Sequence, residues 1–283
     1  MRRLTYENSR GEIIQFYLSP LVIESLTGIG EVDAEVQSQR APYQDGDTYI
    51  DTILQPRFID LEGSITKTDL QEIKRYRKHI LRVCNPKLGL GKITLELDGD
   101  IKEIRGSLDG APVFPERGQN VWQKFMVSWK CPSPYWRDPQ EVSRALHAYQ
   151  PTFKYPVKYP AMYGFSGDST ILENDGDVDT PVTIDVQGPV TNPQIKNLTT
   201  GEFIKINRSL SADEILHIDT NTQNKRVEIY RNGSVLEKAW GYVDDDSTFL
   251  MLIPGNNEIE YLADSGGVNG IVAIGWHNRY AGI

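Results

Sequence analysis

A short proline-rich segment divides this sequence into two blocks. Three prolines fall within residues 131–139, and proline has no N–H donor and a fixed φ, so no central strand or helix can run through the segment. Residues that precede proline adopt extended backbone. We therefore interpret the segment as a stiff interdomain connector built on Pro132, Pro134, Tyr135 and Trp136. This predicts two domains, residues 1–140 and 141–283, with the alternative that residues 279–283 cross back and complete a sheet of the first domain.

Length and charge agree with two domains of different surroundings. The chain has 283 residues, enough for two hydrophobic cores. Residues 1–140 carry 19 Lys and Arg against 20 Asp and Glu, and residues 141–283 carry 11 against 19, which gives net charges of −1 and −8. Such an acidic second half argues against binding to nucleic acid, which needs a cationic face.

The sequence offers no sign of a membrane or a secretory route. It has no apolar run of about 18 residues, so no membrane span is expected. No apolar segment follows the basic Arg2 and Arg3, so no signal peptide is expected. The two cysteines, Cys84 and Cys131, are predicted to be buried and unpaired in a reduced compartment, because two distant cysteines are more often small buried apolar residues than a bridge.

The first block is predicted to be a β-sandwich with one helix and a long β-hairpin arm. Val32, Ala34 and Val36 alternate with polar residues, which is typical of a half-buried strand. A polar stretch with an Asp-Gly turn signal follows, and we expect a hairpin there. It has few apolar residues to bury, so it is either loose or lies against another subunit. Its candidate interface residues are Pro42, Tyr43, Asp45, Gly46 and Tyr49.

One helix is predicted, over residues 69–84. Apolar residues recur there at helical spacing, Thr68 with Gln71 matches a capping box, and Asn85-Pro86 ends the pattern. The basic run at residues 74–78 could be a nucleic-acid patch. We interpret it instead as a solvated helix face.

The second block is predicted to consist of short strands and turns almost throughout. Residues 182–186 and 215–219 alternate in polarity, and Asn232-Gly233 is a strong hairpin signal. No helical stripe is present. The fold class is therefore mainly β with one notable helix, and this block is predicted to be a β-sandwich or jelly roll.

No constellation of catalytic, cofactor-binding or metal-binding residues is found. The acidic stretch 174–179 fails as an EF-hand, because Thr180 and Val186 occupy the positions that need glycine and glutamate. The four histidines lack metal-ligand spacing. A pair of carboxylates for glycoside cleavage depends on a separation in space and stays open. Tyrosines at 149, 155, 159 and 163 either pin the connector to its domain or stack on sugars.

An ordered set of short motifs resembles the siphophage distal tail proteins. In the second block the motifs are residues 176–181, Gly188-Pro189, Asn192-Pro193, Thr200-Gly201, Asp219-Thr220, residues 254–259 and residues 279–283. In the first block they are Asp45-Gly46, Pro56-Arg57, Asn85-Pro86 and residues 132–136. The resemblance covers essentially the whole chain, and its specificity comes from the order of the motifs.

The resemblance implies a structural virion protein at the distal end of a phage tail, assembled in the host cytoplasm. An N-terminal domain would form a homohexameric ring, or two stacked rings, and a galectin-like β-sandwich would project outward. The ring would join the tail tube protein and the tape-measure protein to tail-tip, tail-associated lysin or receptor-binding baseplate proteins, and DNA would pass through it without specific binding. The hairpin would interlock neighbouring subunits.

Two other classes of function stay open. One is a carbohydrate-binding adhesion module that recognises the host surface, although Trp276, His277, Asn278 and Arg279 are contiguous and do not reproduce the distributed sugar site of galectins. The other is an enzyme that acts on cell-wall polymer. Neither is favoured, and we expect no enzyme activity and no cofactor.

Overall fold

The chain forms two compact units. The computed structural model describes residues 2–67, 69–115, 122–146, 148–149, 169–266 and 271–283. The first unit comprises Met1–Pro139 together with Tyr280–Ile283, and the second comprises Gln140–Arg279. The last four residues therefore leave the predicted second domain, 141–283, and rejoin the first unit. Among the described residues no helix is long and apolar enough to cross a membrane.

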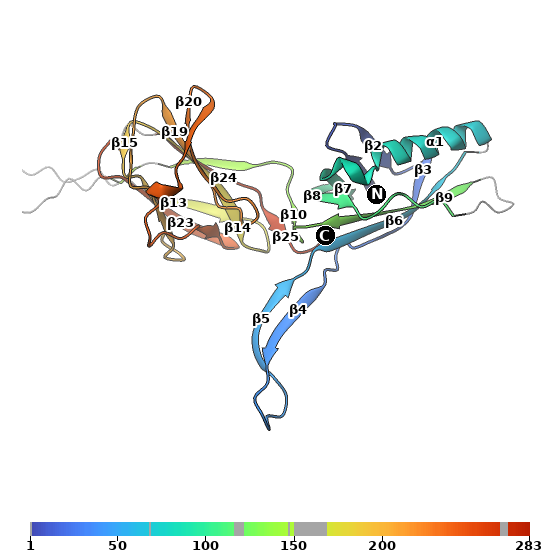
Figure 1. Ribbon diagram of the computed structural model, residues 1–283, viewed down its shortest axis with the longest axis horizontal. Coiled ribbons are helices and arrows are strands. Elements are labelled where there is room, and N and C mark those ends of the chain that lie inside the picture. The colour runs from blue at the N-terminus through green and yellow to red at the C-terminus, as the bar shows by residue number, and fades with distance from the viewer. Residues whose placement is uncertain (1, 68, 116–121, 147, 150–168, 267–270) are drawn as a thin grey trace, which may run out of the picture. The chain divides into compact units, whose positions relative to one another are not determined.

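The first unit is built on one curved sheet with a helix and a separate hairpin (Figure 1). Within the described residues the strand order is β2-β1-β7-β8-β9-β6-β3, with β10 paired to β8 and β25 paired to β10. The elements are β1 Arg2–Glu7, β2 Ile13–Phe16, β3 Leu21–Thr27, β4 Ala34–Gln39, β5 Thr48–Leu54, β6 Arg57–Ile65, α1 Leu70–Val83, η1 Pro86–Leu88, β7 Gly91–Leu97, β8 Asp100–Leu108, β9 Gln123–Cys131, β10 Trp136–Arg137 and β25 Arg279–Tyr280.

Aromatic side chains hold the two ends of this sheet face to face. The ring centroids of Tyr6 on β1 and Trp129 on β9 lie 5.6 Å apart, and those of Phe16 on β2 and Phe125 on β9 lie 5.5 Å apart. These tilted pairs are favourable beyond the area that they bury. One core results, enclosed between the strands at the start of the chain and β6 with β9.

Helix α1 adds its apolar stripe to the same core. Ile73, Ile80 and Val83 are buried there. The prediction for residues 69–84 is confirmed in its place and type, but the N-cap is Asp69, whose carboxylate accepts a hydrogen bond from the backbone N–H of Gln71 at 3.1 Å. Thr68 lies outside the described residues.

The second unit contains two larger sheets with a shared core. One has the order β11-β24-β14-β19-β20-β21, with β22 paired to β14, and the other β12-β23-β16-β17, with β13 paired to β23. The elements are β11 Val142–Leu146, β12 Ala148–Tyr149, β13 Thr170–Asn174, β14 Thr180–Gln187, β15 Val190–Thr191, β16 Gln194–Asn197, β17 Phe203–Lys205, β18 Ser209–Leu210, β19 Glu214–Asp219, β20 Arg226–Arg231, β21 Ser234–Lys238, η2 Trp240–Tyr242, β22 Met251–Leu252, β23 Gly255–Leu262 and β24 Ile271–Trp276.

Alternation places one face of each strand in this core. On β14, Val182, Ile184 and Val186 are buried, and they lie level with buried residues of β19 and β24. Asn232 and Gly233 both have positive φ in the turn between β20 and β21, as the sequence predicts. The mainly β fold class with one α-helix is confirmed across the described part of the chain.

Candidate assembly site

A hairpin that packs on nothing else is the most unusual surface of the first unit. Strands β4 and β5 pair with each other from Ala34 opposite Leu54 to Gln39 opposite Thr48, and in the described residues this two-stranded sheet has no further strand. Figure 1 shows it extending away from the rest of its unit. We call residues 34–54 the arm. Both outer edges of the arm therefore present unpaired backbone donors and acceptors.

The predicted interface residues all lie at the tip of the arm or beside it. Pro42, Tyr43, Asp45 and Gly46 fall in the loop between the two strands, and Tyr49 lies on β5. Tyr43 is fully exposed, with a relative accessibility of 106%, and Tyr49 is 63% exposed. The structure thus brings these residues together at one end of the hairpin.

Side-chain hydrogen bonds give the tip a defined shape. Gln44 donates to the Thr48 hydroxyl at 3.1 Å, its side-chain oxygen accepts from the Ala41 N–H at 3.1 Å, and its carbonyl accepts from Arg40 Nε at 3.0 Å. Gly46 has a φ of +72°, which glycine adopts without steric cost. The tip is held by its own residues, so it does not need a partner to adopt this turn.

Two expectations about the arm are wrong. A half-buried strand is predicted over residues 32–36, but the strand, β4, begins at Ala34 and is exposed on both faces because no second layer covers it; half-buried Val32 precedes it. The arm is also less polar than expected, since Val36, Ile50 and Ile53 are exposed in addition to Tyr49. Ile50 and Ile53 lie just beyond the polar stretch around the Asp45-Gly46 turn. Their apolar side chains could have indicated from the sequence that the arm carries apolar residues.

Buried Arg57 fixes the base of the arm. Only 1% of its surface is exposed, and its Nη1 donates to the carbonyl oxygens of Gly28 at 2.8 Å and Glu31 at 2.8 Å, in the segment that leads into β4. A backbone hydrogen bond of 2.8 Å from Gln55 to Asp33 closes the hairpin next to it. The sequence gives no role to this arginine beyond its place before a strand.

The same guanidinium binds two other segments of the unit. Its Nε donates to the Pro134 carbonyl at 2.7 Å, and its Nη2 donates to the Ala281 carbonyl. Burial lowers the pKa of Arg57, but an arginine stays charged in a protein. Five carbonyl oxygens, those of Gly28, Ile29, Glu31, Pro134 and Ala281, therefore share one buried cation.

The predicted interdomain connector is in fact part of the first unit. Trp136 is buried in the first core and its indole N–H donates to the Ile29 carbonyl at 3.0 Å. Arg137 pairs with Glu103 on β8, with Nε 2.8 Å from the carboxylate. Pro134 is held by Arg57, as described above, and Tyr135 is half-buried. Trp136 is an apolar anchor, which the interpretation as a connector overlooked.

The C-terminal residues dock beside this segment. Tyr280 donates its hydroxyl to Asp138 at 3.1 Å, and the Lys102 ammonium lies 4.4 Å from the centre of its ring. The backbone N–H of Ile283 lies 3.4 Å from the Ile29 carbonyl, and the Ile283 side chain packs on the first core. The base of the arm, the proline-rich segment and the C-terminal residues therefore form one contiguous cluster around Arg57.

The two cysteines lie in the interior of the first unit. Cys84 and Cys131 are buried and unpaired, as predicted, and burial raises the pKa of each thiol to about 12. No group of three His, Cys, Asp or Glu side chains in the described part of the chain could hold a metal ion. The predicted tyrosine cluster lies outside the described residues, except for the backbone of Tyr149.

The stretch that most resembles a galectin motif is structural. Trp276 is buried, and its indole N–H donates to the side chain of buried Asn278 at 3.2 Å. The Thr180 hydroxyl donates to the His277 carbonyl at 2.6 Å. A buried tryptophan cannot stack on a sugar from solvent, so Trp276 does not play the part of the galectin tryptophan.

Comparison with known proteins identifies the class. Residues 175–280 match the protein family described as siphovirus-type tail component, C-terminal domain. All of this match except Tyr280 lies within the second unit, Gln140–Arg279, which is therefore similar to that domain. Comparison with curated protein sequences finds no significant match.

Solved structures extend the likeness to the whole chain. The fold is similar to the Dit protein (gp 19.1) of phage SPP1, described as a paradigm of the hub adsorption apparatus in phages that infect Gram-positive bacteria, with a TM-score of 0.70 and 14% identity over 98% of both chains. It is also similar to chains of the phage P2 baseplate in its activated conformation with Ca and with Sr, with TM-scores of 0.56 and 0.55 at 10% and 9% identity over 100% of both chains. The resemblance to siphophage distal tail proteins is confirmed.

Proposed function

We propose that this chain is a non-enzymatic virion protein that forms a hexameric ring hub at the distal end of a phage tail. The observation that carries the proposal is the arm, a fully paired hairpin that packs on nothing in its own unit. The fold likeness to a protein described as a hub supports the same conclusion.

The arm has the properties of an interlocking element. Its free strand edges can add to a sheet of the next subunit by backbone hydrogen bonding, and Val36, Ile50 and Ile53 supply apolar contacts. A contact between the arm and a different surface of the neighbour is heterologous, and repeated rotation closes such contacts into a ring. Docking would also cover apolar residues that are now in water.

The partners follow from this place in the virion. On one side the ring would bind the tail tube and tape-measure proteins, and on the other the tail-tip, lysin or receptor-binding baseplate proteins. DNA would pass through the lumen, so the lumen should bind it weakly. Residues 1–140 have a net charge of −1, which is compatible with that requirement.

The decisive experiment removes the arm without disturbing its base. Asp33 and Gln55 are already joined by a backbone hydrogen bond, so an Asn-Gly turn can replace residues 34–54 between them. Light scattering should give about six times the 32.0 kDa chain mass for the intact protein, or twice that for stacked rings. The armless variant should be a folded monomer with an unchanged unfolding temperature.

A single-residue pair provides a matched control. Ile53→Asp places a charge on the arm, whereas Ile171→Asp places the same charge at an exposed isoleucine of β13 in the second unit. The first substitution should dissociate the ring and the second should not. A ring that survives both Ile53→Asp and loss of the arm would show that the arm is not the interlocking element.

A further inference from the structure

The solvent-facing side of helix α1 combines apolar and cationic residues. Leu70 and Leu81 are 56% and 43% exposed, and the exposed lysines Lys74 and Lys78 lie between them. The spacing i, i+4, i+8, i+11 places all four on one stripe of the helix, which runs beside the buried stripe of Ile73 and Ile80. Exposed leucines do not help to keep a protein in solution, so Leu70 and Leu81 require another explanation.

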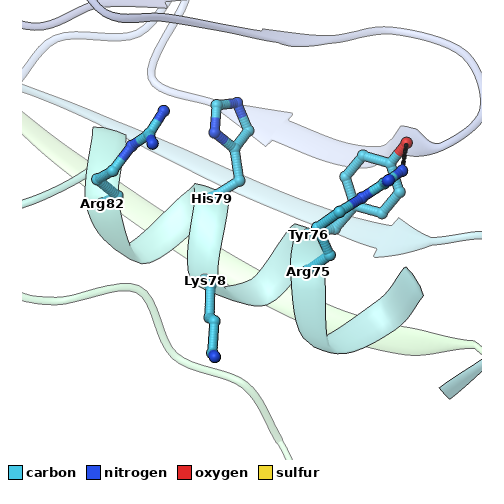
Figure 2. Close-up of a pocket in the computed structure, with 5 residues that line it drawn as sticks. All are labelled: Arg75, Tyr76, Lys78, His79 and Arg82. Atoms are coloured by element: carbon cyan, nitrogen blue, oxygen red, sulfur yellow. Dashed lines mark hydrogen bonds between the residues drawn. The ribbon is translucent and has the colours of Figure 1, made fainter. Parts of the chain in front are cut away.

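A hollow borders this stripe along the same helix. It has a volume of about 420 Å³ and is lined by Arg75, Tyr76, Lys78, His79 and Arg82. Figure 2 shows His79 and Arg82 extending to the same side of α1, with the Arg75 and Tyr76 side chains next to each other. The α1 face is defined here as Leu70, Leu81, Lys74, Lys78 and the residues that line this hollow.

The cations of the α1 face are only partly neutralised. Arg82 pairs with Glu12 at 3.1 Å, and Arg75 lies 3.6 Å from Glu72. In the described part of the chain, no ion pair includes Lys74 or Lys78. The helix carries five Lys and Arg against Glu72 alone, a net charge of +4 in a chain whose total is −9.

The helix dipole does not account for this concentration of charge. Cations stabilise a helix near its C-terminus, and Arg82 is so placed. Lys74, Arg75 and Lys78 lie in the first half and the middle of α1, where the dipole gives them no advantage. Packing does not account for it either, since these three side chains are exposed.

We propose that the α1 face is a docking surface for an acidic segment of another protein, with glutamate or aspartate opposite the cations and apolar side chains against Leu70 and Leu81. Complementary charge on the rim of an interface steers and orients a partner, and the apolar residues bury area. The inference concerns a different surface from the arm and does not depend on the ring.

Two other occupants fit the observations less well. Nucleic acid would use the cations but would leave the exposed Leu70 and Leu81 uncovered. The acidic second unit of another copy would use both, but it would make the protein alone self-associate through α1. Each alternative predicts its own outcome in the test.

The test measures binding between the full chain and a fluorescently labelled peptide in which glutamates and leucines recur at helical spacing. Binding is measured by fluorescence anisotropy at low salt. The unmodified protein should bind this peptide and should not bind the version with glutamine in place of glutamate. Lys74→Glu/Lys78→Glu should weaken binding at least about tenfold, which corresponds to about 1.4 kcal/mol. Leu70→Ser/Leu81→Ser should weaken it while leaving the salt dependence unchanged.

Lys87→Glu/Arg105→Glu is the matched control. It makes the same change of charge at two exposed cations of the first unit outside the α1 face, and it should alter binding less than about twofold. Equal losses in the two charge variants, no peptide binding at all, or equal competition by duplex DNA would each overturn the proposal. A fall in particle mass with Lys74→Glu/Lys78→Glu would also overturn the proposal, because it would indicate that another copy of the chain binds the α1 face. The arm variants test the ring separately.

Discussion

Replacing Arg57 should destabilise the first unit far more than replacing any exposed arginine. Each hydrogen bond from a charged donor contributes roughly 1.5–3 kcal/mol, and the three N–H groups of Arg57 Nε and Nη1 donate to four carbonyl oxygens at 2.7–3.2 Å, one N–H of Nη1 being shared between two acceptors. The cost of taking the guanidinium out of water offsets much of this sum, as the lowered pKa of Arg57 shows. Arg57→Met should therefore cost about 3–5 kcal/mol, because it leaves carbonyl oxygens of three segments without their donor, at roughly 1–3 kcal/mol for each that stays buried.

Calorimetry of the full chain measures this cost. In a unit of about 140 residues a loss of about 1 kcal/mol lowers the unfolding temperature by roughly 3 °C, so the first unit should unfold about 9–15 °C lower. Arg57→Lys should recover only part of the loss, because a compact ammonium cannot reach acceptors on three segments at once. Arg105→Met, at an exposed arginine, should change the unfolding temperature by less than about 2 °C.

Hydrogen exchange locates the effect. Ala281 accepts from Arg57, so both Arg57 variants should speed the exchange of the Ile283 amide, which is bonded to Ile29. Unchanged exchange there, with a loss of stability below about 1 kcal/mol in Arg57→Met, would refute the idea that this cation holds the three segments together.

Three further outcomes test other parts of the structure. Gly28→Ala should destabilise the first unit by several kcal/mol in chemical denaturation, because φ is +80° and a Cβ would lie 1.7 Å from the Phe58 carbonyl oxygen. Gly201 has the same φ but open space around it, so Gly201→Ala should cost only about 1–2 kcal/mol. Both cysteines should resist alkylation at pH 8 until the protein unfolds, since burial raises the pKa of each thiol to about 12. A hydrogen bond to Asp185 raises the pKa of His217 above 6.5. The pair should therefore add up to about 1 kcal/mol to the free energy of unfolding below pH 6.5, and this contribution should be lost as pH rises through the raised pKa. Asp185→Asn should flatten that part of a plot of stability against pH.

Much of the fold could be predicted from local pattern. The helix at residues 70–83 follows from apolar spacing and a proline stop, and the hairpin turn at Asn232-Gly233 follows from residues that tolerate positive φ. These signals are local, so a sequence contains them in full. The error at residues 32–36 has the same origin, because alternation shows that a strand has two unlike faces and does not show whether a second layer covers one of them.

The candidate site could be predicted only at the tip of the arm. Asp45-Gly46 marks a turn, and the lack of local apolar support suggested a partner. The cluster at the base has no such signal, because Arg57 binds backbone carbonyls, which every residue type provides. Its acceptors Pro134 and Ala281 lie 77 and 224 residues away in the sequence. Only the folded chain shows that these positions meet.

An arm that binds a neighbour benefits from a rigid base. Ordering a loose segment on association costs conformational entropy, roughly 1–2 kcal/mol for each residue fixed, and that cost subtracts directly from the affinity of the interface. In this chain the hairpin is already paired along its length, its tip is shaped by Gln44, and its base is held where Arg57 binds the Gly28 and Glu31 carbonyls. If the arm binds a neighbour as proposed, most of this ordering is complete before the subunits meet, and the exposed apolar residues of the arm then contribute to binding rather than to folding the arm.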